Sequence, residues 1–250
     1  MPFRLMCRKS VLLATALTLG LAPLTATAES SAGAYLAAGV ASAEADYAAA
    51  VDWYGRALAD DPANPALLEG AVLAQIGVGN MEQAAQMAQA LLATGAKSQT
   101  ATVALIADAA KRKDFEAILA QAAEGSSAGA VLDDLVKAWA KLGLGRMSEA
   151  TETFDKLAKT KGLEAFGLYH KALALASAGD FEGADEILSG RAAGTIAVNR
   201  RGVIAHVEIL SQLEKNADAI ALIDRSFAPG SDMQVDDLRR RLAAGEPLPF

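Results

Sequence analysis

The chain has 250 residues, of which 52% are hydrophobic and only 5% are aromatic, and its 23 basic and 30 acidic side chains give a formal net charge of −7. Because an acidic chain is repelled by phosphate backbones, this balance argues against nucleic-acid binding. Short β-branched runs and the lack of alternation argue against strands. The many small apolar residues favour closely packed helices over a deep ligand pocket.

Residues 1–28 have the three parts of a secretory signal peptide. Three basic side chains lie within residues 4–9, residues 10–24 form an uncharged apolar run, and Ala26-Thr27-Ala28 fits the small-x-small cleavage rule. We expect cleavage after Ala28 and a periplasmic mature protein that makes no membrane contact after cleavage. An uncleaved membrane anchor is the alternative, although the run is shorter than the roughly 20 residues that span a bilayer.

The single cysteine, Cys7, lies before the apolar run, so the predicted mature chain has none. Without disulfides, packing alone must hold an exported fold together. Removing residues 1–28 takes away three basic and no acidic side chains, which leaves a formal net charge of −10. Such an acidic surface favours solubility.

A six-residue pattern recurs along the chain. Each copy is a polar turn, usually an aromatic or Met side chain, and the first turn of a helix that ends in a small residue. The hexads begin at Ala45, Gly79, Lys113, Gly145, Gly179 and Glu214. Their last residues are Ala50, Ala84, Ile118, Ala150, Ala184 and Ala219, which are spaced by 34, 34, 32, 34 and 35 residues. A fixed period in this range indicates a stacked helical array.

Each hexad lies between two apolar stretches with helical spacing, so one unit is predicted to be helix, turn, helix. A single hairpin cannot bury both of its faces, and it therefore stacks on its neighbours. The clearest predicted helices cover residues 34–43, 47–59, 68–78, 81–92, 135–142, 147–159, 168–177, 181–188, 203–213, 217–227 and, as a final capping helix, 236–244.

The third unit departs from the pattern. Lys113-Asp114-Phe115 keeps the turn, but Ile118 replaces the small residue, and the Gly- and Ser-rich residues 124–129 interrupt the second helix. We expect a shortened helix and a local kink there.

The first unit carries the most specific pattern. The residues Tyr47-x-x-Ala50-Val51-x-Trp53-Tyr54-x-x-Ala57-Leu58-x-x-Asp61-Pro62-x-Asn64 resemble the second helix and exit turn of a tetratricopeptide repeat. The resemblance implies that Ala50, Tyr54 and Ala57 form the contact between paired helices and that Pro62 ends the unit. Their i, i+4, i+7 spacing places the three on one helix face. The matching structural positions in later units are Ala84, Ala150, Phe154 and Ala184.

The resemblance implies an all-α fold, a right-handed superhelical solenoid of about six stacked helix-turn-helix (tetratricopeptide-like) repeats. The repeat domain is expected over residues 29–227, followed by a C-terminal capping helix and tail over residues 228–250. Two alternatives remain open. One is an irregular helical bundle, and the other is a different helical repeat such as a Sel1-like array, which Trp53-Tyr54 would also suit.

In the tetratricopeptide family the first helix of each hairpin lines the concave side. Matching that register predicts partner-binding residues at Tyr35, Leu73, Val103, Leu135, Trp139, Tyr169 and Leu173. The Lys and Asn set with which some relatives clamp a terminal carboxylate is absent there. We therefore expect an apolar, aromatic-lined channel for a helix or an extended segment. Alternatively, Trp139 and Tyr169 pack between repeats.

Candidate chemistry is sparse. Residues 125–129 match Gly-x-Ser-x-Gly, but that motif needs a strand before its serine, and a helix is predicted there. The two histidines, His170 and His206, lie at similar places in successive first helices, and a zinc site needs at least one more ligand. We expect no catalytic, cofactor or metal site.

Together these features predict a non-catalytic periplasmic scaffold that binds a protein or peptide in the concave groove. The alternative function is an accessory module that binds a small molecule or a polysaccharide in an envelope assembly.

Overall fold

The computed structural model describes residues 31–123, 125, 127–191 and 199–250, and these residues form thirteen α-helices and no strand. No helix within these ranges is long and apolar enough to cross a membrane. The predicted signal peptide lies outside the described residues. The helices are α1 Ser31–Ala43, α2 Tyr47–Asp60, α3 Pro65–Gly77, α4 Met81–Ala93, α5 Gln99–Lys111, α6 Phe115–Ala123, α7 Ala130–Gly143, α8 Met147–Ala158, α9 Glu164–Ser177, α10 Phe181–Leu188, α11 Arg200–Gln212, α12 Asn216–Ser226 and α13 Met233–Ala243.

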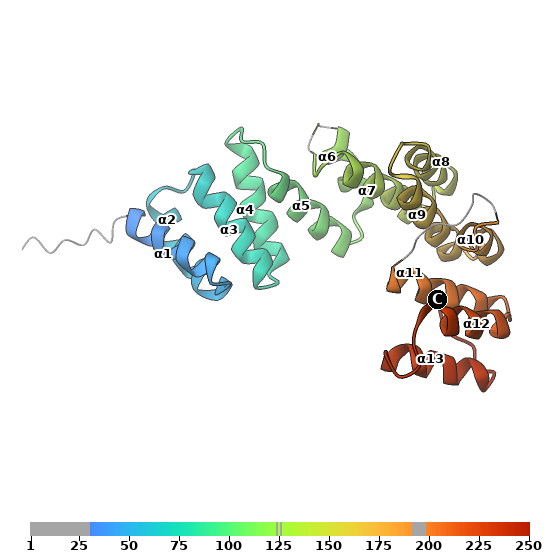
Figure 1. Cartoon of the computed structure of the whole chain (residues 1–250). Coiled ribbons are helices and arrows are strands. Elements are labelled where there is room, and N and C mark those ends of the chain that lie inside the picture. Colours follow the sequence, from blue (N-terminus) through green and yellow to red (C-terminus); the bar gives the residue numbers. More distant parts are fainter. Residues whose placement is uncertain (1–30, 124, 126, 192–198) are drawn as a thin grey trace, which may run out of the picture.

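Consecutive helices pack in pairs, from α1 with α2 to α11 with α12, and α13 packs on α12. Figure 1 shows these hairpins following one another in an elongated row, with α11 to α13 (orange and red) turned to one side of the others. The core is therefore divided into a series of small clusters between neighbouring helices. The predicted helical solenoid of stacked hairpins is confirmed.

Each hexad contains the end of one helix and the beginning of the next. Its first residue has a positive φ, the left-handed conformation that ends a helix. The values are 58° at Ala45, 78° at Gly79, 58° at Lys113, 74° at Gly145, 89° at Gly179 and 58° at Glu214.

The second hexad residue completes both caps. Its N–H donates to the carbonyl five residues back, for example from Asp180 to Leu175 at 2.9 Å. Where this residue is aspartate, its carboxylate also accepts an N–H from the next helix, as Asp180 does from Gly183 at 2.9 Å. Asp46 and Asp114 do the same. This shared capping chemistry explains why the same kind of turn recurs between the paired helices.

The last hexad residues are buried where neighbouring helices pack. Ala50, Ala84, Ala150, Ala184 and Ala219 are 0% exposed, and Ile118 is 4% exposed. The other predicted structural residues follow the same faces: Ala57 and Phe154 are 0% exposed and Tyr54 is 7% exposed, while Pro62 is exposed in the turn after α2. Small side chains at these positions let the helix backbones approach closely.

Three glycines on first helices lie against side chains or backbone of the preceding second helix. The sequence alone did not predict these contacts. A Cβ added at Gly70 would lie 2.2 Å from the Tyr54 ring, and one at Gly143 would lie 2.5 Å from the Phe115 ring. At Gly167 it would lie 2.3 Å from the backbone nitrogen of Ala158. Each of these glycines therefore permits a close contact between units.

Contacts between units fix the direction of curvature. The first helices α1 and α3, α3 and α5, α7 and α9, and α9 and α11 pack against each other. Within the described part of the chain, no successive second helices pack closely. A stack that is tight on one side and open on the other curves toward the tight side. The first helices therefore form the inner surface.

The third unit interrupts the stack, as predicted. Its second helix, α6, has only nine residues, against thirteen in α4. Along their described residues, α5 and α7 do not pack closely, unlike the other successive first helices. The core here shrinks to Ala109, Ile118 and Ala140 with a few half-buried neighbours.

The segment after α13 packs against α11 to α13. Leu248 is 0% exposed within this last cluster, and its backbone N–H donates to Ser211 Oγ at 2.9 Å. Arg200 on α11 holds Asp232, the N-cap of α13, through two hydrogen bonds of 2.5 and 3.0 Å. Arg239 pairs with Asp224 on α12. Helix α13 thus covers the apolar end of the stack and presents charge outward.

We expect Gly167→Ala to lower the free energy of unfolding by about 1 to 3 kcal/mol, because the new methyl group meets helix backbone that cannot move locally. Gly55→Ala is the control, since an added Cβ there meets nothing within 4 Å. That variant should gain up to about 1 kcal/mol from helix propensity. Urea denaturation measures both, and equal midpoints would contradict the close contact between α8 and α9.

Candidate functional site

The N-terminal half of the inner surface exposes apolar side chains. Tyr35 on α1, Leu73 on α3 and Val103 on α5 are 44%, 50% and 38% exposed. All three come from first helices, which the packing places on the inside of the curve. Folding has left their apolar area accessible to another molecule.

Tyr35 borders an open pocket of about 280 Å³ between α1 and the start of α3. The pocket is lined by Ala32, Tyr35, Asp61, Asn64, Ala66 and Leu67. Asn64 accepts the N–H groups of Ala66 and Leu67 at 3.0 and 3.3 Å and donates to Asp61 at 2.9 Å. These bonds fix the polar rim of the pocket beside the tyrosine ring.

The four predicted partner-binding residues in the C-terminal half of the array pack within the protein. Trp139 on α7 donates its indole N–H to His170 Nδ1 on α9 at 3.2 Å. Its ring also contacts Phe154 edge-to-face, with centroids 5.8 Å apart, and Tyr169 contacts His170 in the same way at 5.3 Å. Burial lowers the pKa of His170, so the neutral ring that accepts this bond is favoured.

These contacts join the fourth and fifth units. Leu135 packs in the Trp139 cluster, and Tyr169 packs in the next one. Leu135, Trp139, Tyr169 and Leu173 are all half-buried. The seven predicted partner-binding residues therefore divide into three exposed side chains in the first three units and four half-buried ones in the fourth and fifth units.

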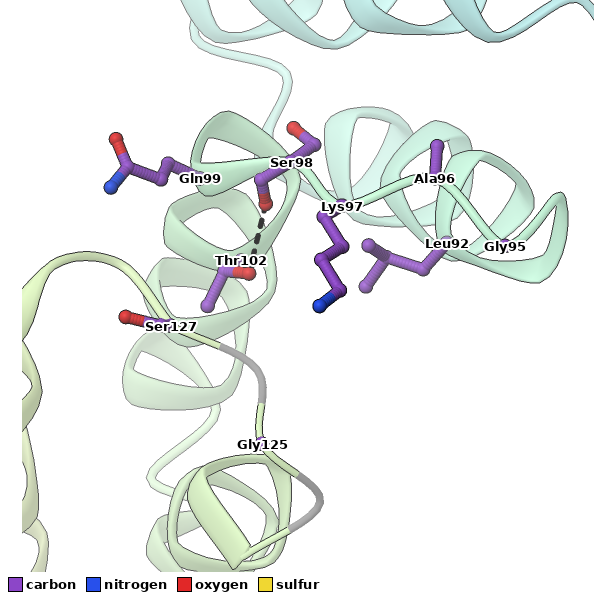
Figure 2. A pocket seen from close by; sticks show the side chains of 9 residues that line it. All are labelled: Leu92, Gly95, Ala96, Lys97, Ser98, Gln99, Thr102, Gly125 and Ser127. Carbon is purple, nitrogen blue, oxygen red and sulfur yellow. Dashed lines mark hydrogen bonds between the residues drawn. The ribbon is translucent and has the colours of Figure 1, made fainter.

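A second open pocket, of about 410 Å³, lies at the third unit. Figure 2 shows that its walls come from the turn between α4 and α5, the start of α5 and the turn before α7. Thr102 is buried there and bonds to the carbonyl of Ser98 at 2.9 Å. Because α6 ends at Ala123, it is shorter than the preceding second helix α4, and this leaves space over α5.

Ser127, at the centre of the Gly-x-Ser-x-Gly match, supports the start of α7. Its hydroxyl donates to Asp133 at 2.6 Å, and Asp133 also accepts the N–H of Ala128 at 2.7 Å. Helix α6 precedes the serine instead of the strand that a nucleophile elbow requires. The two histidines have other partners. The serine is therefore part of a helix cap.

A buried carboxylate joins the last two units. Asp185 on α10 is 2% exposed and bonds His206 Nε2 at 2.8 Å, Arg191 at 2.8 Å and Lys215 at 2.9 Å. Burial raises the pKa of Asp185, but the hydrogen bonds from His206, Arg191 and Lys215 outweigh it, and the pKa falls from 3.8 to about 2. Burial lowers the pKa of His206, although Asp185 opposes the shift. A neutral His206 thus donates its Nε2–H to an ionised Asp185.

The described residues contain no group of three or more His, Cys, Asp or Glu side chains able to hold a metal ion. His170 and His206 are engaged separately, one with Trp139 and the other with Asp185.

The fold is that of a tetratricopeptide repeat protein. No family model matches the sequence, and no curated protein matches it at a significant level. Among solved structures, a tetratricopeptide repeat protein from Parabacteroides merdae is similar with a TM-score of 0.67 and 16% identity over 86% of each chain. The pilF protein of Pseudomonas aeruginosa is similar with a TM-score of 0.53 and 13% identity over 86% of this chain and 97% of that one.

Asp185→Asn should lower the free energy of unfolding at pH 7 by about 2 kcal/mol, the equivalent of its pKa shift. Because the folded pKa lies below the unfolded one, this contribution is present above about pH 4 and is lost as the pH falls toward 2. The difference in the free energy of unfolding between wild type and variant should therefore decrease over that range. Urea titrations at several pH values measure it.

The control for this variant is Glu186→Gln, which changes the neighbouring exposed carboxylate on the same helix. Its effect should stay within about 0.5 kcal/mol. If the loss of unfolding free energy in Asp185→Asn does not depend on pH, the ionised, hydrogen-bonded state of this carboxylate is contradicted.

Proposed function

We propose that the protein is a non-catalytic periplasmic scaffold that binds another protein or a peptide along the inner surface of its first three units. The observation that carries the proposal is the row of exposed apolar side chains Tyr35, Leu73 and Val103 on three successive first helices. Leucine and valine are more often buried than exposed in folded proteins. Their exposure on the inside of the curve favours an apolar guest that spans more than one unit.

The dimensions of this surface favour an elongated guest. Small-molecule sites are usually concave and largely enclosed, whereas the pocket beside Tyr35 is small and open. A helix or an extended segment places side chains at regular intervals and can contact α1, α3 and α5 together. The polar rim at Asp61 and Asn64 provides hydrogen-bonding groups at one end.

The periplasmic location in this proposal is supported by the leader sequence. Basic residues, an apolar run and Ala26-Thr27-Ala28 occur in the order that the export machinery reads. The predicted mature chain contains no cysteine, so an oxidising compartment would not alter its covalent structure.

A photo-reactive residue at Leu73 should cross-link to discrete partner chains in intact cells, because Leu73 lies on the proposed surface. The same residue at Gln89 is the control, since Gln89 is exposed on the second helix α4. Gel shifts of the protein recovered from the periplasmic fraction, followed by mass spectrometry, identify the adducts. Val103→Ser should reduce the Leu73 adducts at least about tenfold without changing the melting temperature, because an exposed side chain contributes little to folding.

Equal cross-linking at Leu73 and Gln89 would count against binding at the inner surface. Bound glycan or metabolite without any protein adduct would instead favour the accessory-module function. Recovery of a chain that begins at Glu29 would support processing after Ala28.

A further inference from the structure

One face of α1 is apolar and uncovered. Leu36 is 67% exposed and Val40 is 59% exposed, whereas Ala34, Ala38 and Ala41 on the opposite face are buried against α2 and α3. The exposed face is therefore distinct from the one that packs within the first unit. It lies at the N-terminal end of the stack.

The residues that correspond to Leu36 and Val40 in the next unit are covered by neighbouring groups. Thirty-four residues after Leu36 stands Gly70, which lies against the Tyr54 ring of the preceding second helix. Thirty-four residues after Val40 stands Ala74, which is only 1% exposed. This face of α3 thus packs against helix α2 of the preceding unit. Among the described residues α1 is the first helix, and its corresponding face is exposed.

If the proposed processing holds, a helix that covers this face would come from another molecule. Cleavage after Ala28 leaves only Glu29 and Ser30 before α1, too few residues for a helix. This step rests on the export proposed above, and an intact mass of the purified protein checks it separately.

Charge favours a second copy of the chain as that molecule. Helix α1 is the only described helix without an Asp, Glu, Lys, Arg or His residue. Two copies of this acidic protein repel each other over most of their surfaces, but they can meet at α1 without opposing charges. Stacking α1 on the other end of a copy would bury the exposed Arg239 and Arg240 of α13. A two-fold contact avoids that cost.

We propose that the mature protein forms a two-fold dimer in which α1 of one copy packs against α1 of its partner. Leu36, Val40 and Ala43 follow an i, i+4, i+7 row on the exposed face, the spacing of a helix-packing seam. Gly39 lies beside this row, and a Cβ added there meets nothing within 4 Å, so the partner helix can approach closely. The two inner surfaces then belong to one bivalent assembly.

The dimer is weak because a single helix pair buries little area. Stable interfaces bury about 1,200 to 2,000 Å² in total, and a contact of one helix per copy falls at or below the lower end. The protein should be monomeric at about 1 μM and mainly dimeric at about 500 μM.

Sedimentation equilibrium of protein purified from the periplasm tests this range. The weight-average mass should approach twice the monomer mass at the highest concentration. Leu36→Glu/Val40→Glu should remain monomeric throughout, because like charges would face each other across the axis. Met233→Glu is the matched control, since Met233 is 89% exposed on α13, and it should dimerise like wild type. A wild type that stays monomeric, or a double variant that still dimerises, would overturn the proposal.

The absence of cysteine from the predicted mature chain allows a geometric test. Val40→Cys should form a disulfide-linked dimer under mild oxidation, because residues near a two-fold axis meet their own copies. Met233→Cys should remain mostly monomeric under the same conditions. A dimer in which Val40→Cys fails to link to itself would overturn the α1 contact, and an intact mass that retains residues 1–28 would remove its premise independently.

Discussion

The close approach of helix backbones at small buried residues is the contact on which the rest of the structure depends. The alanines that end five of the six hexads are fully buried, and glycines such as Gly70 and Gly167 lie in close contact with the neighbouring unit. Larger side chains there would push the hairpins apart. Since the first helices also pack on each other, this contact creates the curvature and the inner surface on which the proposed binding depends.

The interruption of the stack at the third unit divides that surface into two regions. Before it, Tyr35, Leu73 and Val103 leave apolar area exposed. Beyond it, the Trp139 and His170 pair and the buried Asp185 join successive units from within. Groups already engaged in this way are costly to redirect toward a guest, because a broken buried hydrogen bond leaves an unsatisfied partner. We therefore propose the N-terminal half as the binding region.

Much of the fold could be predicted because its signals are local. The left-handed residue and the capping residue of each turn are adjacent in sequence, so the hexads marked the hairpins and their period. The short α6 followed from the Gly- and Ser-rich residues after it. The buried end of the chain at Leu248 was missed, because its partner Ser211 lies far away in sequence.

The candidate site was less accessible to sequence reasoning. Register placed Trp139 on the inner surface, but only tertiary contacts show that its N–H is used by His170. Asp185 stands inside an ordinary helical pattern, and its partners come from three other positions in the chain. Exposure depends on what the neighbouring unit covers, and this distinguished Leu73 from the half-buried Leu173.

A pair of alanine substitutions on one helix tests the central contact most directly. Ala84 and Ala90 both lie on α4, the first fully buried and the second exposed. In equilibrium urea denaturation, Ala84→Leu should cost about 1 to 3 kcal/mol through overpacking, while Ala90→Leu should change the stability by less than about 0.5 kcal/mol. If the two variants unfold at the same denaturant concentration as the parent, close packing at the repeated alanines does not hold the stack together.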